Sequence, residues 1–223
     1  KEKRYNWELV FCEMYAGGKY HNDEDGSYEY SLGLNGLGLC ATQYASEYMD
    51  VEIHTGDTKY TLHFEHGQNV GGLHKEPSKA KSGTKIRWKP DLQVFTDINV
   101  PLEYYVDTLR QAIVNDGLRF ILQNETDHGF ETQEFFYENG IADHVREIAG
   151  DDALTPVQFW HAEKKVRDRA DKPEYKVKIN VALAFSNRNH LVEYYHNTSW
   201  LEHGGAPDKA ARNAFVDQID AYL

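Results

Sequence analysis

Apolar and polar residues alternate along several stretches of the chain, and this pattern predicts β-strands. In one of them Val177, Ile179, Val181, Leu183 and Phe185 alternate with other residues, which is typical of a half-buried strand within 174–185. Further strands are predicted at 49–54, 59–65, 84–89, 118–122, 130–137 and near 156–163. The first two flank Thr55-Gly56-Asp57 and should form a β-hairpin, whereas residues 66–83, rich in Gly, Pro, Ser and Lys, should form a loop.

Apolar residues spaced three and four apart predict helices in the same chain. One helix, with Trp7, Val10, Phe11 and Met14 on one face, should end at Gly17 and Gly18. Others are expected at 141–149, at 208–222 and after Pro101, the last with Leu102, Tyr105, Leu109, Ala112 and Ile113 facing inward. Together with the strands, these helices predict a fold of the α+β class.

One predicted helix begins directly after the glycine-rich segment 33–38, which reads Gly-Leu-Asn-Gly-Leu-Gly. Glycine lets the backbone approach an anion closely, and a helix N-terminus carries unpaired N–H groups and a partial positive charge. The pattern is therefore typical of a phosphate-binding loop, although many glycine-rich turns before a helix only reverse the chain. The apolar face of this helix is expected to contain Leu37, Cys40, Ala41, Tyr44, Ala45 and Tyr48.

The chain of 223 residues has a formal net charge of −12, which argues against the chain as a whole being an electrostatic DNA binder. The charge is uneven, because 72–89 contains six basic residues and one acidic residue, and 161–178 contains seven basic and four acidic ones. Each run is either a solvated face or a contact surface for a phosphate backbone. No apolar run is long enough for a membrane span and no signal peptide is recognisable, so a cytoplasmic protein is expected.

Cysteine and histidine positions do not suggest a metal site. Cys12 and Cys40 lie on predicted apolar helix faces without metal-ligand spacing, so we expect buried, reduced thiols. The histidines lack the spacing of a zinc site, and we interpret them as surface or core residues.

Four motifs in a fixed order point to a known family. The first runs from Ala16-Gly17-Gly18-Lys19-Tyr20 through an acidic stretch and Ser27-Tyr28 to the glycine-rich segment 33–38. The others are Ser82-Gly83-Thr84 with the downstream Trp88-Lys89-Pro90-Asp91, the segment 136–141, and Asn197-Thr198 followed by His203-Gly204-Gly205. This order resembles the B subunits of bacterial type IIA DNA topoisomerases, gyrase and topoisomerase IV, in which the first motif is the ATP lid.

The resemblance implies a fold and a division into domains. Residues 1–127 would be the C-terminal part of a Bergerat (GHKL) ATPase domain, a mixed sheet backed by helices. Residues 128–223 would be most of a transducer domain resembling the second domain of ribosomal protein S5, with the boundary at Asp127-His128-Gly129. In the intact enzyme ATP closes two B subunits into a homodimer, the A subunit is a partner, and hydrolysis drives passage of one DNA duplex through a break in another. In such enzymes the transducer lines a DNA-holding cavity, so the resemblance makes 161–178 the better candidate of the two basic runs for contact with DNA.

The resemblance also implies roles for individual residues in binding ATP and Mg²⁺. The metal ion would bridge the phosphates, Lys19 would lie near them beside Gly17 and Gly18, and Thr84 would lie behind the base. Tyr28 would lie near the purine, or would instead be a loop aromatic packed on the hairpin. The backbone N–H groups that would hold the β- and γ-phosphates belong to Gly33, Leu34, Asn35, Gly36, Leu37, Gly38 and Leu39.

Several family features do not occur in this sequence. The helix with the general-base Glu and the magnesium-binding Asn, the Asp-x-Gly-x-Gly loop and the Gln-Thr-Lys loop are not found, and Leu32 and Asn35 replace a Gly and a His of the lid. The chain therefore resembles a fragment that does not hydrolyse ATP by itself. Two alternatives remain open: a non-catalytic interaction module with a vestigial nucleotide lid, or another ATPase of the same superfamily.

Overall fold

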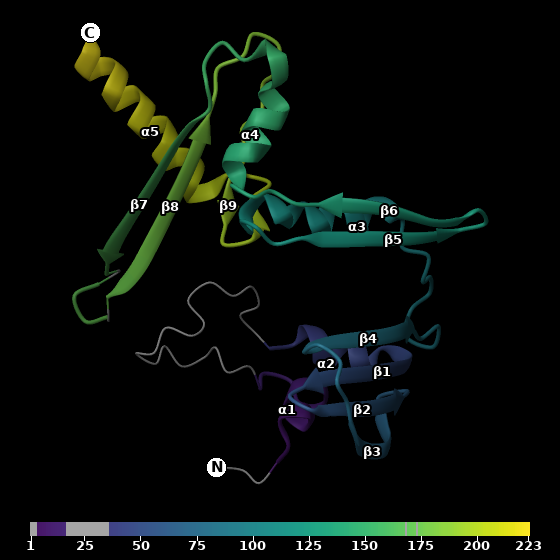
Figure 1. Ribbon diagram of the computed structural model, residues 1–223. Helices are drawn as coiled ribbons and strands as arrows, with labels where there is room; N and C mark the ends of the chain where they lie inside the picture. Colours follow the sequence, from purple (N-terminus) through teal and green to yellow (C-terminus); the bar gives the residue numbers. More distant parts are fainter. Residues whose placement is uncertain (1–3, 17–35, 168, 173) are drawn as a thin grey trace. The chain divides into compact units, whose positions relative to one another are not determined.

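A computed structural model describes residues 4–16, 36–167, 169–172 and 174–223, as helices and strands that divide into two compact units (Figure 1). The units are Lys1–Val100 and Pro101–Leu223, and each is described by itself. Both contain helices and antiparallel β-structure, so the predicted α+β class is confirmed. Among the described residues, no helix is both long and apolar enough to cross a membrane.

The first unit is a four-stranded antiparallel sheet with two short helices. Its strand order is β3-β2-β1-β4, so β3 and β4 lie at the edges of the sheet as described (Figure 1). The elements are α1 (Asn6–Cys12), α2 (Gly38–Tyr44), β1 (Ser46–Thr55), β2 (Thr58–Glu65), β3 (Gln68–Pro77) and β4 (Gly83–Pro90).

Strand alternation gives this sheet one apolar and one polar face. Met49, Val51, Leu62 and Phe64 are buried on one face and form the core of the unit with Phe11 of α1. The next residue along each strand points to the opposite face, which is polar. Helix α1 packs on the apolar face through Phe11, and the polar side chains of the opposite face contact one another.

The predicted hairpin is confirmed, but the predicted loop 66–83 is wrong for most of its length. Strand β3 pairs with β2 through this segment, and only 78–82 lies between β3 and β4. The register shifts where Gly71 and Gly72 adopt φ values of +83° and +73°. Glycine reaches such values without strain, so the glycines form a bulge within the strand rather than ending it.

The helix predicted after the glycine-rich segment is shorter than its apolar pattern suggested. It ends at Tyr44, and β1 begins at Ser46. Tyr48, predicted on the helix face, instead pairs with Glu65 of β2 and Lys89 of β4. Pairing on both sides satisfies the backbone groups of this segment, so tertiary contacts override the helical periodicity.

The second unit contains three two-stranded antiparallel sheets, β5-β6, β7-β8 and β10-β9, within its described residues. Helix α4 contacts β8 and the turn η2. The elements are α3 (Leu102–Leu109), η2 (Arg110–Val114), β5 (Phe120–Thr126), β6 (Gly129–Phe135), α4 (Ile141–Ala149), η3 (Gly150–Asp152), β7 (Gln158–Val166), β8 (Tyr175–Leu183), β9 (Tyr195–His196), β10 (Ser199–Trp200) and α5 (Gly205–Tyr222).

The elements predicted for this unit are confirmed, but the predicted burial is only partly correct. Ala112 and Ile113 are buried as expected, whereas Leu102 and Tyr105 are exposed. On β8, Ile179 and Val181 are 51% and 43% exposed. Periodicity identified the strand, but a two-stranded sheet offers its apolar face little cover.

The two units divide at a different place from the boundary predicted at Asp127-His128-Gly129. That turn joins β5 to β6, and the two strands pair from Phe120 with Phe135 to Thr126 with Gly129. The contacts within the chain place both strands in the second unit, which begins at Pro101.

Candidate functional site

The described part of the glycine-rich segment forms the start of α2. Gly36 has φ +57°, and Leu37, at the N-cap, has φ −105° and ψ −34°. A left-handed residue followed by a right-handed one turns successive N–H groups toward a common point, an arrangement that binds anions. The N-cap has no side-chain hydrogen bond among the described residues, so the side chains leave the first-turn N–H groups of α2 available.

Gly38, the first residue of α2, is not required by packing. A Cβ atom built on it has no described neighbour within 4 Å. A backbone can approach a ligand closely only where no side chain stands between them, and the free space at Gly38 meets this requirement.

The side chain of Thr84 lies on the apolar face of the sheet, and Leu39 packs against the core on that same face. Thr84 pairs with Ile53 across β4 and β1, so its side chain lies on the face that bears the core and contacts α1. Leu39 of α2 packs against that core. The remaining predicted site residues lie outside the described residues: Gly17, Gly18, Lys19, Tyr28, Gly33, Leu34 and Asn35.

The two cysteines lie where α1 and α2 meet. Cys40 is 1% exposed, Cys12 is partly buried, and both are free thiols. Burial raises the pKa of both thiols, and the proximity of Cys40 raises that of Cys12 further. Cys40 is buried as expected, whereas Cys12 is only partly buried, and the raised pKa values of both thiols disfavour a nucleophilic role.

Asp91 anchors the end of β4, a role that sequence motifs alone did not reveal. Its carboxylate is 2.7 Å from Nδ1 of His66 and accepts a 2.8 Å hydrogen bond from the backbone N–H of Gln93. Its own N–H donates to the carbonyl of Ala45, between α2 and β1. The Gln93 N–H and then His66 hold the pKa of Asp91 below its ordinary value. The motif Trp88-Lys89-Pro90-Asp91 therefore fixes β4 to the corner that follows α2.

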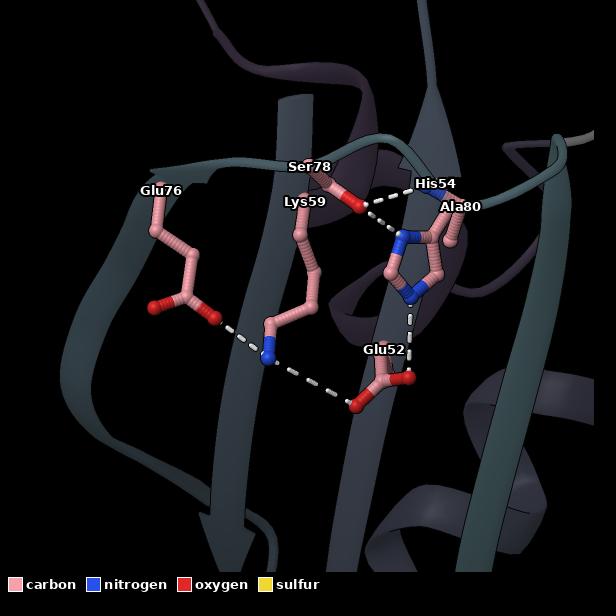
Figure 2. Close-up of polar contacts among 6 residues, drawn as sticks. All are labelled: Glu52, His54, Lys59, Glu76, Ser78 and Ala80. Atoms are coloured by element: carbon pink, nitrogen blue, oxygen red, sulfur yellow. Dashed lines mark hydrogen bonds and ion pairs between the residues drawn. The ribbon is translucent and has the colours of Figure 1, made fainter. Parts of the chain in front are cut away.

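A network of polar contacts lies on the polar face of the four-stranded sheet, as Figure 2 shows. Nε2 of His54 lies 2.9 Å from Glu52, and its Nδ1 lies 2.9 Å from Oγ of Ser78. Lys59 forms an ion pair with Glu76 and lies 4.0 Å from Glu52. The Ser78 hydroxyl also accepts the N–H of Ala80, so the network holds the loop 78–82 against β1 (Figure 2). These residues are scattered in the sequence and only strand pairing brings them together.

His63 lies between two carboxylates on the same face. Its Nδ1 is 2.6 Å from Asp50 and its Nε2 is 3.1 Å from Glu65. These contacts, Asp50 first, raise the pKa of His63 above its ordinary value of 6.5. The groove beside it has a volume of about 390 Å³ and is lined in part by His74, Lys85 and Arg87. Among the described residues, no three His, Cys, Asp or Glu side chains are grouped so that they could hold a metal ion.

We expect the Asp50→Asn variant to lower the pKa of His63, because Asp50 is the main cause of its elevation. A raised pKa in the folded state stabilises the fold below the unfolded value, and this contribution is lost as the pH rises through the folded pKa. Titration of the imidazole resonances by NMR measures the effect. Glu65→Gln should cause a smaller decrease, and an equal or larger one would contradict the assignment.

The segment 136–141 contributes to a polar cluster in the second unit. His144 is 7% exposed, and its Nε2 lies 3.1 Å from Glu193, which also accepts a 3.0 Å hydrogen bond from Tyr195. Tyr137 packs edge-on against His144 and donates to Glu147 at 2.9 Å. Burial, and then Glu147, raise the pKa of Tyr137 to about 12. The cluster links α4 to the segment before β9, which is a structural role.

One solved structure is similar in part to this chain. The crystal structure of the 43K ATPase domain of Thermus thermophilus gyrase B in complex with an aminocoumarin aligns with 68% of this chain and 40% of that one, at 22% identity and a TM-score of 0.48. No protein-family model matches the chain.

Curated relatives match nearly every residue of the chain. It is 27% identical over 219 residues to the B subunit of DNA gyrase from Chlamydia muridarum, which covers 97% of this chain and 26% of the relative. It is 27% identical over 224 residues to the protein of the same name from Thermotoga maritima. This match covers 100% of this chain and 34% of that relative. The protein of that name from Staphylococcus epidermidis is 25% identical over 220 residues, 96% of this chain and 32% of its own length. The chain thus spans about a third or less of these relatives. The resemblance predicted from its motifs is confirmed: over 96–100% of its length, the chain is similar to one part of these B subunits of DNA gyrase.

Proposed function

We propose that this chain is the ATP-binding and transducing part of an ATP-dependent type IIA DNA topoisomerase. The observation that carries the proposal is the match to the B subunits of DNA gyrase over 96–100% of the chain. The match extends well beyond the lid, so it does not favour a non-catalytic module with a vestigial lid.

The proposed domains follow the resemblance, with residues 1–127 in the ATPase part and 128–223 in the transducer. Unit 1 contributes the sheet and the helices α1 and α2 to the ATPase part. Helix α3 and strand β5 would be the last elements of that part, although they pack with the second unit. Coupling between the two domains would then pass through elements that both share.

In the proposed site, the start of α2 binds the phosphates of ATP. The left-handed Gly36 and the uncapped helix start suit an anion, and Thr84 lies on the sheet face that contacts α1. The part of the lid that precedes Gly36 would add Gly17, Gly18, Lys19, Tyr28, Gly33, Leu34 and Asn35. Backbone N–H groups and a helix dipole bind negative charge without a side-chain cation, which is the chemistry that this end of α2 supplies.

Mg²⁺ would be held chiefly by the phosphates of the nucleotide. The described residues have no group of three metal-ligating side chains, so the chain's own contribution is to orient the phosphates. The ion would neutralise phosphate charge, while the backbone of Gly36 to Leu39 positions the phosphate oxygens.

Double-stranded DNA, the A subunit of the topoisomerase and a second copy of the B subunit are the proposed partners, in the cytoplasm. The homodimer would depend on ATP. These partners follow from the proposed function and not from a contact within the described residues.

The proposal is tested by titrating the amide resonances of the chain with ATP, GTP and pyrophosphate. We expect binding of millimolar order, about −4 kcal/mol, with little preference for the base. The shifts should concentrate at 36–40. Gly36→Val should abolish binding, since a β-branched side chain opposes φ +57° and blocks the approach of an anion.

Gly56→Val is the matched control. Gly56 has φ +56° in the β1–β2 turn, so the substitution imposes the same backbone strain away from α2. It should leave the nucleotide shifts unchanged. Micromolar and adenine-selective binding, or shifts that persist in Gly36→Val, would show that the phosphate site is elsewhere.

A further inference from the structure

We propose that the edge strand β4 and the loop before it form a contact surface for the phosphate backbone of duplex DNA. The surface, termed here the β4 strip, contains Lys79, Lys81, Lys85 and Arg87. The choice of DNA rests on the proposed function, whereas the surface itself is inferred from side-chain contacts within the first unit.

The four side chains of the β4 strip are exposed, and none of them forms an ion pair with a described residue. The carboxylates opposite them are already occupied, because Asp50 contacts His63 while Glu52 contacts His54 and lies near Lys59. Arg87 instead lies over the ring of Tyr48, 5.8 Å from its centroid. His54 first, and Lys59 and Lys85 after it, lower the pKa of Glu52, so Lys85 lies near that carboxylate. None of the four cations, however, forms an ion pair within the described sheet.

The geometry of the β4 strip suits a regular row of anions. Lys85 and Arg87 are two residues apart on one face of a strand, so they are about 6.7 Å apart along it. Phosphates of one DNA strand rise by only ~3.4 Å along the helix axis, but each is also rotated around the duplex, so consecutive phosphates lie farther apart than this rise. The spacing of Lys85 and Arg87 therefore suits consecutive phosphates of one strand. Lys89 continues the row and pairs with Glu47, while the contact of Ser78 with His54 holds the loop that carries Lys79 and Lys81 (Figure 2).

The other basic run, 161–178, is organised differently. Lys176 and Lys178 both contact Glu163, and Arg167 contacts Glu174. Ion pairs within the chain compete with a phosphate for the same cations, so the paired cations of this run are less available to a phosphate. The contacts therefore favour the β4 strip, whereas the family resemblance favours 161–178 and residue spacing does not choose between the two runs.

The test is the affinity of the full chain for a fluorescein-labelled duplex of about 30 base pairs, measured by anisotropy across a series of salt concentrations. The double variant K85Q/R87Q removes two phosphate contacts, so the slope of log K against log salt should decrease by about 1.8 and the affinity in 0.1 M salt by about 60-fold. Both side chains are exposed, so circular dichroism and thermal unfolding should show an intact fold.

The matched control is K176Q/K178Q, which makes the same charge change two residues apart on one face of β8, at two lysines that both contact Glu163. It should retain the affinity and salt slope of the parent. The proposal is overturned if the parent does not bind the duplex in low salt, if K85Q/R87Q binds like the parent, or if the control loses as much affinity. It is also overturned if polyglutamate binds the strip more tightly than DNA at equal charge, which would indicate an acidic protein partner. None of these results bears on the nucleotide titration at Gly36, so the two proposals fail independently.

Discussion

Replacing Phe64 with alanine is expected to lower the free energy of unfolding of the first unit by about 3–5 kcal/mol. Phe64 is 1% exposed, and its ring lies 5.6 Å from that of Phe11 and 6.2 Å from that of Trp7, measured between centroids. These rings join β2 to α1, so the variant loses both apolar burial and the contact that holds the helix on the sheet. Native domains are stable by only about 5–15 kcal/mol, so most of the unit's stability is at risk.

Urea unfolding followed by tryptophan fluorescence and circular dichroism measures this loss. Phe130→Ala is the control, because Phe130 of β6 is 66% exposed and its truncation should cost less than about 1 kcal/mol. Equal losses for the two variants would contradict the assignment of the core to Phe64 and its neighbours.

Replacing Gly140 with alanine is expected to destabilise the second unit by about 4 kcal/mol. Gly140 precedes α4 with φ +53° and ψ −128°, a conformation that other residues adopt only with strain. A Cβ atom there would overlap the Asp116 side chain and lie 3.2 Å from the carbonyl oxygen of Ile113. Backbone strain and steric overlap act at one residue, so their costs combine.

Two further variants separate the causes. Gly150 has φ +52° and ψ −147°, and a Cβ atom there has no described neighbour within 4 Å, so Gly150→Ala should cost only the backbone strain, about 2 kcal/mol. Adding Asp116→Ala to Gly140→Ala should recover part of the steric cost. Thermal and urea unfolding measure all three variants, and equal costs for Gly140→Ala and Gly150→Ala would show that the overlap is relieved without cost.

The candidate anion site stays a prediction from the sequence, and the sequence could indicate it because its chemistry depends on local backbone conformation. The glycines before α2 indicated an anion site, and the left-handed Gly36 and the uncapped start of α2 agree with it. The anchoring role of Asp91 could not be predicted, since its partners at Ala45 and His66 are distant in sequence. The signal that could have found it was the position of an acidic residue directly after the proline that ends β4.

Elements of the fold whose pattern is local could be predicted from the residues alone. The turn at Gly56 indicated the β1–β2 hairpin, and apolar spacing was sufficient to identify α4, α5 and β8. That 68–77 is a strand depends on long-range pairing, because its glycines form a bulge that is stable only when β2 pairs alongside. It likewise decided that α2 ends at Tyr44, because the residues from Ser46 onward pair with neighbouring strands.

The positions of charged residues could be read from the sequence, but their ion-pair partners could not. Composition alone located two basic runs, but which cations are free depends on the residues opposite them across the strands. His63 and His54 engage the carboxylates of β1, and this leaves Lys85 and Arg87 without an ion pair within the described sheet. Pairing of charges is a property of strand register, and register is set by long-range hydrogen bonds that no local pattern encodes.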